Sequence, residues 1–184
     1  MRVITGIAKG RKLQTLPGSD IVRPTGDRVK EAVFSAIQFD IEGRRVLDLF
    51  SGSGQMGIEA LSRGAASAVF VDNSPASLDV TKKNLSVTGL IGAAQIINSD
   101  YSSFLARTGS VFDIAFLDPP YNAGILEDAL CKTLPHISDY GTVFCEHPTG
   151  AALPGSVAGF KVFKTYKFGG VSVTMYKKED FINE

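Results

Sequence analysis

The chain has 184 residues, of which 44% are hydrophobic and 21% charged, a composition that is ordinary for a globular protein and excludes global disorder. Its 19 basic and 19 acidic residues give a net charge of zero, and no apolar run approaches the roughly 18 residues of a membrane span. This length predicts one domain, and the start at Met1-Arg2-Val3-Ile4-Thr5 lacks the apolar stretch of a signal peptide, so we expect a cytoplasmic protein.

The charge is unevenly distributed along the chain. Residues 1–45 carry nine Lys/Arg against five Asp/Glu, a balance of +4, and residues 161–184 carry five against three, a balance of +2. The middle, residues 46–160, carries five against eleven, a balance of −6. Basic terminal segments indicate an anionic partner such as nucleic acid, whereas the alternative is a solvated surface with scattered lysines.

The first 44 residues predict a small extension ahead of the main unit at 45–184. Residues 1–5 and 11–16, separated by a turn-like stretch at 6–10, predict a β-hairpin. Val29, Val33, Phe34 and Ile37 fall at helical spacing, which predicts a helix over about 27–38 with one apolar face.

From residue 45 onward, strand-like and helix-like segments alternate. Strands are expected at 46–50, 68–72, 94–98, 112–117 and 141–146, and helices at 54–63, 75–88, 101–107 and 123–134. Segments 160–166 and 171–176 predict a closing hairpin around Gly169-Gly170. This pattern predicts a Rossmann-like α/β fold with a mostly parallel, seven-stranded sheet and a C-terminal antiparallel hairpin. The sites of such sheets lie at the carboxyl ends of the strands.

Other features predict structure rather than chemistry. Cys131 and Cys145 form no CxxC pair, and no Cys/His cluster has metal-ligand spacing, so buried free thiols and no metal site are expected. Several phenylalanines are expected in the core: Phe112, Phe116, Phe160 and Phe163.

A glycine-rich segment predicts a nucleotide-like cofactor site. Gly52-Ser53-Gly54-Gln55-Met56-Gly57 is a complete G-x-G-x-x-G between a predicted strand and a predicted helix, which is the context that this motif needs. Glycines let the backbone turn tightly and approach a ligand closely. Asp72 ends the next predicted strand, where its carboxylate can accept hydrogen bonds from ribose hydroxyls.

The motif alone does not choose between a dinucleotide and S-adenosylmethionine. Asp48, inside the first strand, would repel a pyrophosphate but suits the cationic amino-acid end of S-adenosylmethionine, unless it is a structural cap on the loop. Asp100 can bind an adenine amino group, cap the helix at 101–107, or do both. We expect S-adenosylmethionine as the cofactor. The predicted cofactor-binding residues are Asp48, Phe50, Ser51, Gly52, Gly54, Asp72, Asn73, Asp100 and Tyr101.

Asp118-Pro119-Pro120-Tyr121, after the fourth predicted strand, is the predicted catalytic segment. Its prolines have fixed φ angles and no N–H, so the loop is stiff and exposes carbonyl oxygens. Together with the Asp118 carboxylate, these oxygens can accept hydrogen bonds from an amino group, and Tyr121 can stack on a planar base. Hydrogen bonds to these acceptors make the amino nitrogen more nucleophilic. Holding that nitrogen in line with a methyl donor accounts for much of the rate of such a methyl transfer. The alternative is a rigid structural turn with a packed tyrosine.

The order of these motifs resembles the class I S-adenosylmethionine-dependent amino-methyltransferases. Three N-terminal segments narrow the resemblance to the RsmD-type family: Ile4-Thr5-Gly6, Lys9-Gly10-Arg11-Lys12-Leu13, and Arg23-Pro24-Thr25 followed by Asp27-Arg28-Val29-Lys30-Glu31. The resemblance runs from about residue 2 to 176. It implies methyl transfer to the N2 amino group of a guanine in small-subunit (16S) ribosomal RNA.

The resemblance also implies a partner and a set of contacts. The partner would be ribosomal RNA or a partly assembled small subunit, bound by a protein that we expect to be a monomer. The predicted phosphate-binding residues are Arg2, Lys9, Arg11, Lys12, Arg23 and Arg28. Two other functions stay open from the residues alone: an adenine-N6 methyltransferase of DNA or RNA, and a dinucleotide-dependent oxidoreductase or non-catalytic nucleotide-binding module.

Overall fold

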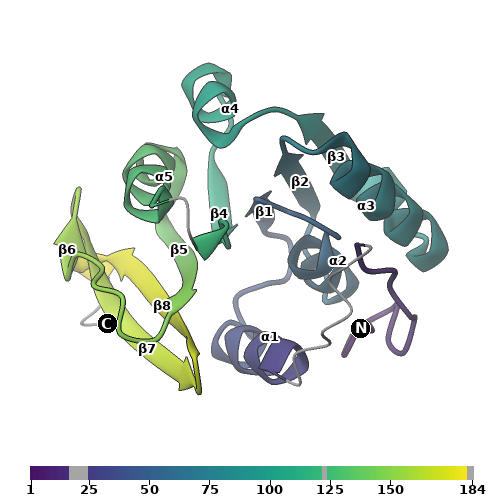
Figure 1. Ribbon diagram of the computed structural model, residues 1–184, viewed down its shortest axis with the longest axis horizontal. Helices are drawn as coiled ribbons and strands as arrows, with labels where there is room; N and C mark the ends of the chain where they lie inside the picture. Colours follow the sequence, from purple (N-terminus) through teal and green to yellow (C-terminus); the bar gives the residue numbers. More distant parts are fainter. Residues whose placement is uncertain (17–24, 122–123, 182–184) are drawn as a thin grey trace.

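The centre of the molecule is one eight-stranded sheet, seen in a computed structural model that describes residues 1–16, 25–121 and 124–181 (Figure 1). The strand order is β3-β2-β1-β4-β5-β8-β7-β6. The parallel strands are β1 (Arg45–Leu49), β2 (Ser67–Asp72), β3 (Ala94–Asn98), β4 (Phe112–Leu117) and β5 (Ile137–Pro148). The antiparallel end comprises β6 (Ser156–Val157), β7 (Phe160–Phe168) and β8 (Val171–Lys178). The predicted fold class is confirmed, and the two-residue β6 is an addition to the seven expected strands.

Helices cover both faces of this sheet, with a hydrophobic core on each side (Figure 1). One face carries α1 (Thr25–Ala36), α2 (Gln55–Ser62) and α3 (Pro75–Thr88), and the other carries α4 (Tyr101–Arg107) and α5 (Leu126–Thr133). Short 3-10 helices lie at Ile91–Ala93, Leu134–His136 and Glu179–Phe181. Because both faces are covered, most residues of the central strands are buried, and their sequences are mostly apolar rather than alternating between apolar and polar.

Several predicted details differ from the structure. Strand β5 starts at Ile137 rather than at residue 141, because Ile137 already pairs with Phe112 of β4, ahead of the register shift that precedes the pair of Ile114 with Thr142. The predicted start of the helix at residue 123 lies outside the described residues, and α5 is helical from Leu126. Cys145 is buried as expected, but Cys131 is exposed on α5. Phe163 is 46% exposed rather than in the core, because the pairing of β7 with β8 is irregular at this residue.

The N-terminal segment contains a single antiparallel bridge, between Arg2 and Lys12, rather than a full hairpin. It lies against α2, where the Ile4 and Thr5 N–H groups donate to the Glu59 carboxylate at 2.8 and 3.0 Å. Gly6 has φ +88°, and a Cβ there would lie 1.7 Å from the Ser62 carbonyl oxygen, so this close approach requires glycine. Residues of this segment share the core beneath α1 and α2, while a division at residue 44 stays a prediction.

No helix in the described part of the chain is long and apolar enough to cross a membrane. In the same described residues, no group of three or more His, Cys, Asp and Glu side chains is placed to hold a metal ion.

Candidate active site

A cleft of about 740 Å³ opens at the carboxyl ends of β1, β2, β4 and β5. This volume falls within the roughly 300–1,000 Å³ of small-molecule sites. Ten residues predicted from the sequence line it: Phe50, Gly52, Asp72, Asn73, Asp100, Tyr101, Asp118, Pro119, Pro120 and Tyr121. The glycine loop and the tetrapeptide therefore meet at one cleft, because the parallel strands that precede them end at the same edge of the sheet. They are 64 positions apart in the sequence, counted from residue 54 to residue 118.

The glycine loop is held in one conformation by hydrogen bonds from α3 and β2. The Gly52 N–H donates to Asp72 Oδ2, and the Thr81 hydroxyl donates to the Gly52 carbonyl oxygen, both at 2.8 Å. A Cβ at Gly57 would lie 2.3 Å from the Phe70 ring, so glycine permits the close packing of α2 on β2. Phe50 has φ +69°, a left-handed conformation that costs a non-glycine residue about 1–3 kcal/mol. The loop is thus ordered before any ligand binds.

Asp72 lies between the glycine loop and the start of α3. Its Oδ2 accepts from Gly52, and its Oδ1 accepts from the Ser74 N–H at 2.9 Å. Each carboxylate oxygen can accept a second hydrogen bond, so the group can still bind a ribose hydroxyl in the cleft. This role of Asp72 stays a prediction.

Asp48 lies beneath the loop rather than on the wall of the cleft. Its side chain is only 4% exposed, and its Oδ2 accepts from the Gly57 N–H at 2.9 Å. Burial raises the pKa of the Asp48 carboxyl to about 7, and the hydrogen bond from Gly57 opposes that rise. The contact is that of the structural cap on the loop, and direct binding of a cationic cofactor group by Asp48 stays a prediction.

Substituting Asp48 with asparagine is expected to change how stability depends on pH. The folded pKa of about 7 exceeds the unfolded value of 3.8, so the folded state holds one more proton between those values, and wild-type stability falls as pH rises from about 4 to about 7. Asp48→Asn keeps an acceptor for Gly57 and should exceed wild type above pH 7 by on the order of 4 kcal/mol. Urea unfolding at pH 4 and pH 8 measures this, and parallel pH profiles would contradict it.

Asp100 and Tyr101 form the wall at the start of α4. Asp100 caps this helix by accepting from the Ser103 N–H at 2.9 Å, which lowers the pKa of its carboxyl and confirms the cap. The rings of Tyr101 and Phe50 lie 5.3 Å apart, and the Tyr101 hydroxyl donates to Asp128 at 2.7 Å. The aromatic pair offers an apolar surface for a planar ring beside a carboxylate.

The tetrapeptide follows β4 directly and contacts the end of β5. The Tyr121 hydroxyl donates to Glu146 Oε1 at 2.7 Å, which fixes the ring while leaving 36% of the residue exposed. Glu146 lines the cleft and was missed as a site residue, although the strand-end rule points to it. The other lining residues outside the prediction are Leu16, Val71, Ser74, Ser77, Ser99 and Ile125.

Two buried polar atoms beside the glycine loop show whether a polar cofactor would fit there. Ser51 Oγ and Gln55 Oε1 are buried without a hydrogen-bond partner among the described residues. Buried polar groups are nearly always paired, so a polar ligand or water is expected beside them. Ser51 and Gly54, which the sequence predicts to bind the cofactor, do not line the cleft, and Gly54, at φ +76°, directly precedes α2. The donors and acceptors present fit the polar amino-acid and ribose groups of S-adenosylmethionine.

The predicted RNA-binding residues lie on the N-terminal segment and α1. Arg2, Lys9, Arg11, Lys12 and Arg28 are exposed, and Arg23 lies outside the described residues. The same segment leads into the cleft, where Leu16 is one of the lining residues.

The buried Asn84 side chain connects this segment to the cofactor loop. It accepts from the Gln14 N–H at 2.8 Å and donates to the Gln14 and Ser53 carbonyl oxygens at 3.0 and 2.9 Å. The predicted RNA-binding segment and the cofactor loop are therefore held together by one amide.

Comparisons with known proteins match nearly the whole chain. The family model described as conserved hypothetical protein 95 matches residues 1–177. Ribosomal RNA small subunit methyltransferase D of Escherichia coli strain K12 is 36% identical over 97% of this chain and 90% of its own length. YlbH of Bacillus subtilis is 38% identical over 97% of this chain and 99% of its own. The solved structure of yhhF from Escherichia coli has a TM-score of 0.87 at 35% identity, covering 97% of this chain and 98% of that one.

These matches agree with the motifs, the sheet topology and the cleft. The shared fold is that of the class I methyltransferases, whose cofactor is S-adenosylmethionine. The resemblance found in the sequence is confirmed, and the chain belongs to the RsmD-type family of S-adenosylmethionine-dependent methyltransferases.

Proposed function

We propose that the protein transfers a methyl group to the exocyclic N2 amino group of a guanine in small-subunit (16S) ribosomal RNA. The observation that carries this proposal is the position of Asp118–Tyr121 on the same cleft as the glycine loop and Asp72. The relatives named as ribosomal RNA small subunit methyltransferase D support the RNA class. Guanine as the base rests on the family resemblance.

Some residues of the cleft would bind the methyl donor, and others would bind the base that accepts the methyl group. Asp72 would hold the ribose of S-adenosylmethionine, and Phe50 and Tyr101 would hold its adenine beside Asp100. When bound, the cofactor supplies an electrophilic sulfonium methyl group.

On the acceptor side, the Asp118 carboxylate and the proline carbonyl oxygens accept hydrogen bonds from the amino group, which makes its lone pair available for in-line attack. Tyr121, positioned by Glu146, stacks on the base, which is splayed out of its own stack.

The extension at 1–44 would bind RNA phosphates through its exposed basic residues. Because this extension is short, a partly assembled small subunit in the cytoplasm is the substrate that fits best, bound by a monomer. The test is to incubate the protein with labelled S-adenosylmethionine and either naked small-subunit RNA or assembling subunits, followed by nucleoside mass spectrometry.

The expected product is N2-methylguanine. Methylated adenine instead would overturn the choice of base, and tight calorimetric binding of NAD without binding of S-adenosylmethionine would overturn the cofactor and the reaction. Mass spectrometry of ribosomal RNA from cells that lack the protein should show the loss of one N2-methylguanine.

A further inference from the structure

Strands β7 and β8 carry a basic charge that the active site does not use. Residues 160–178 contain five lysines and no acidic residue. Strand β7 lies near the open end of the sheet, because β6 pairs with it only at Ser156 and Val157. Most of its side chains are therefore exposed to solvent.

The irregular pairing at Phe163 determines which lysines share a face. Directly opposed residues of antiparallel strands point to the same side of a sheet. Lys161 lies opposite Lys177, and after the shift between Val162 and Lys164, Lys164 lies opposite Met175 and Tyr166 opposite Val173. An extra residue at this point keeps Lys161 and Lys164 on one face, although three positions in a regular strand would place them on opposite faces. We call Lys161, Lys164, Tyr166 and Lys177 the basic face.

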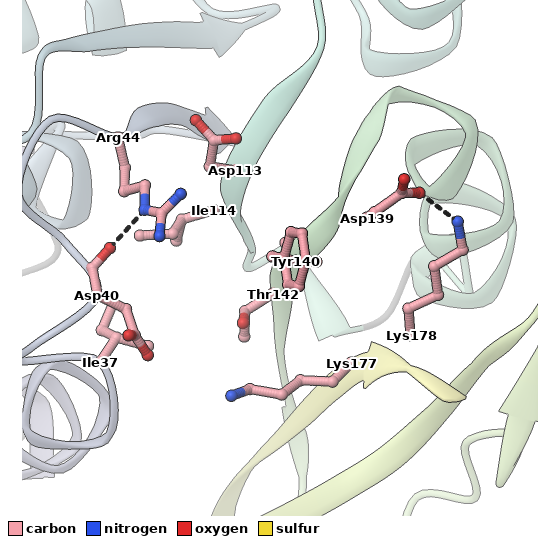
Figure 2. Close-up of a pocket in the computed structure, with 11 residues that line it drawn as sticks. Ile37, Asp40, Arg44, Asp113, Ile114, Asp139, Tyr140, Thr142, Lys177 and Lys178 are labelled. Atoms are coloured by element: carbon pink, nitrogen blue, oxygen red, sulfur yellow. Dashed lines mark hydrogen bonds and ion pairs between the residues drawn. The ribbon is translucent and has the colours of Figure 1, made fainter. Parts of the chain in front are cut away.

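Aromatic rings are interleaved with these lysines. Lys164 Nζ lies 4.9 Å from the centre of the Tyr166 ring, and Lys177 Nζ lies 4.9 Å from that of Phe163. Figure 2 shows Lys177 extending from β8 away from Lys178, which pairs with Asp139. Lys161 pairs with Glu179, whereas no carboxylate of the described residues pairs with Lys164 or Lys177.

The basic face is connected to the catalytic segment through the sheet. The Tyr121 hydroxyl donates a hydrogen bond to Glu146 of β5. Glu146 lies opposite Val173 of β8, which in turn lies opposite Tyr166 of β7. Adjacent strands are about 4.8 Å apart, so Tyr166 is about 10 Å from Glu146 on the same side of the sheet. Val173, which lies between them, is buried, so a polynucleotide whose base enters the cleft at Tyr121 would reach the exposed side chains of β7 past the turn at Gly169-Gly170 rather than over Val173.

We propose that the basic face binds the RNA strand that flanks the methylated nucleotide, with lysines on phosphates and Tyr166 against a base. This inference rests on the proposed RNA methylation and adds a second contact surface to the N-terminal extension. Lysine charge complements phosphate, and rings interleaved with cations are typical of surfaces that bind single strands. Exposed lysines also keep an edge strand from pairing with a second chain. Lys167, on the opposite face of β7, would do this equally well, so this purpose does not require lysines on the basic face.

Lys167 provides a matched control on the same strand. Binding of a fluorescent small-subunit RNA fragment is measured by anisotropy at several salt concentrations for wild type, Lys164→Gln, Lys177→Gln and Lys167→Gln. The first two variants should each lower the slope of log affinity against log salt by about 0.7, the value for one single-strand phosphate contact. They should also raise KM for RNA at unchanged kcat, while Lys167→Gln matches wild type.

The outcomes separate this inference from the proposed function. Equal slopes in all four proteins, or equal losses in Lys164→Gln and Lys167→Gln, overturn the RNA contact. A loss seen only with assembled particles assigns the face to a protein partner and also overturns it. Wild type that binds the RNA fragment but methylates neither naked RNA nor assembling subunits refutes the proposed function, and the comparison of binding among the four proteins still stands.

Discussion

Asp118→Ala is expected to lower kcat for RNA methylation by about 10²–10³-fold, the usual effect of removing one hydrogen-bonding group that acts mainly in the transition state. Asp118 lies in the cleft directly after β4, on the proposed acceptor side, whereas the glycine loop and Asp72 form the proposed donor side. Affinity for S-adenosylmethionine, measured by calorimetry, should therefore remain close to that of wild type. Asp118→Asn keeps one acceptor oxygen and should lose less activity.

Asp79→Ala is the matched control, because Asp79 is an exposed aspartate of α3 outside the lining of the cleft. It should leave both the rate and cofactor binding unchanged. Full turnover by Asp118→Ala would show that the proline carbonyls and Tyr121 suffice, and the assignment of Asp118 would be wrong. A loss of cofactor binding in the same variant would instead make Asp118 part of the donor site.

The strand ends and the cleft could be predicted because their signals are local. Strand β4 closes with the buried apolar residues 114–117, directly before Asp118, and the parallel-sheet rule then places its end beside those of β1 and β2. Helix α3 begins at Pro75 after the Ser74 cap and ends before Gly89, as its sequence indicates. Each of these features depends on a few consecutive residues.

The parts that escaped prediction depend on pairs distant in the chain. The role of Glu146 requires Tyr121, which is 25 positions away, and the exposure of Phe163 depends on the register of β7 against β8. The hydrogen bond of Asp48 with Gly57, which fits the cap considered for this residue, depends on how closely α2 approaches β1, while binding of the ligand by Asp48 stays a prediction. No pattern of consecutive residues specifies the pairing register of two strands or the distance between a helix and a strand.

The largest expected loss of stability follows from a buried ion cluster that the sequence did not reveal. The Glu59 carboxylate is fully buried and accepts hydrogen bonds from the Ile4 and Thr5 N–H groups. It accepts a third hydrogen bond from Arg63 Nε at 2.8 Å. Lys30 Nζ lies 3.5 Å from Glu59 Oε2 and donates to the Arg2 carbonyl oxygen at 2.6 Å. Burial lowers the pKa of Lys30, and Glu59 opposes that shift. Glu59 therefore joins α2, α1 and the N-terminal segment.

Glu59→Gln should lower the free energy of unfolding by about 3–5 kcal/mol, because it leaves a buried ammonium without its counter-charge and turns one acceptor into a donor. Urea unfolding at pH 7 measures this, with Glu31→Gln on the exposed side of α1 as the control. The segment that carries Arg2, Lys9 and Arg11 should also become sensitive to protease before the sheet unfolds. RNA affinity should then fall in the folded variant at unchanged affinity for S-adenosylmethionine. Loss of both affinities in parallel would instead mean that Asn84 cannot hold the cofactor loop once the segment has been released.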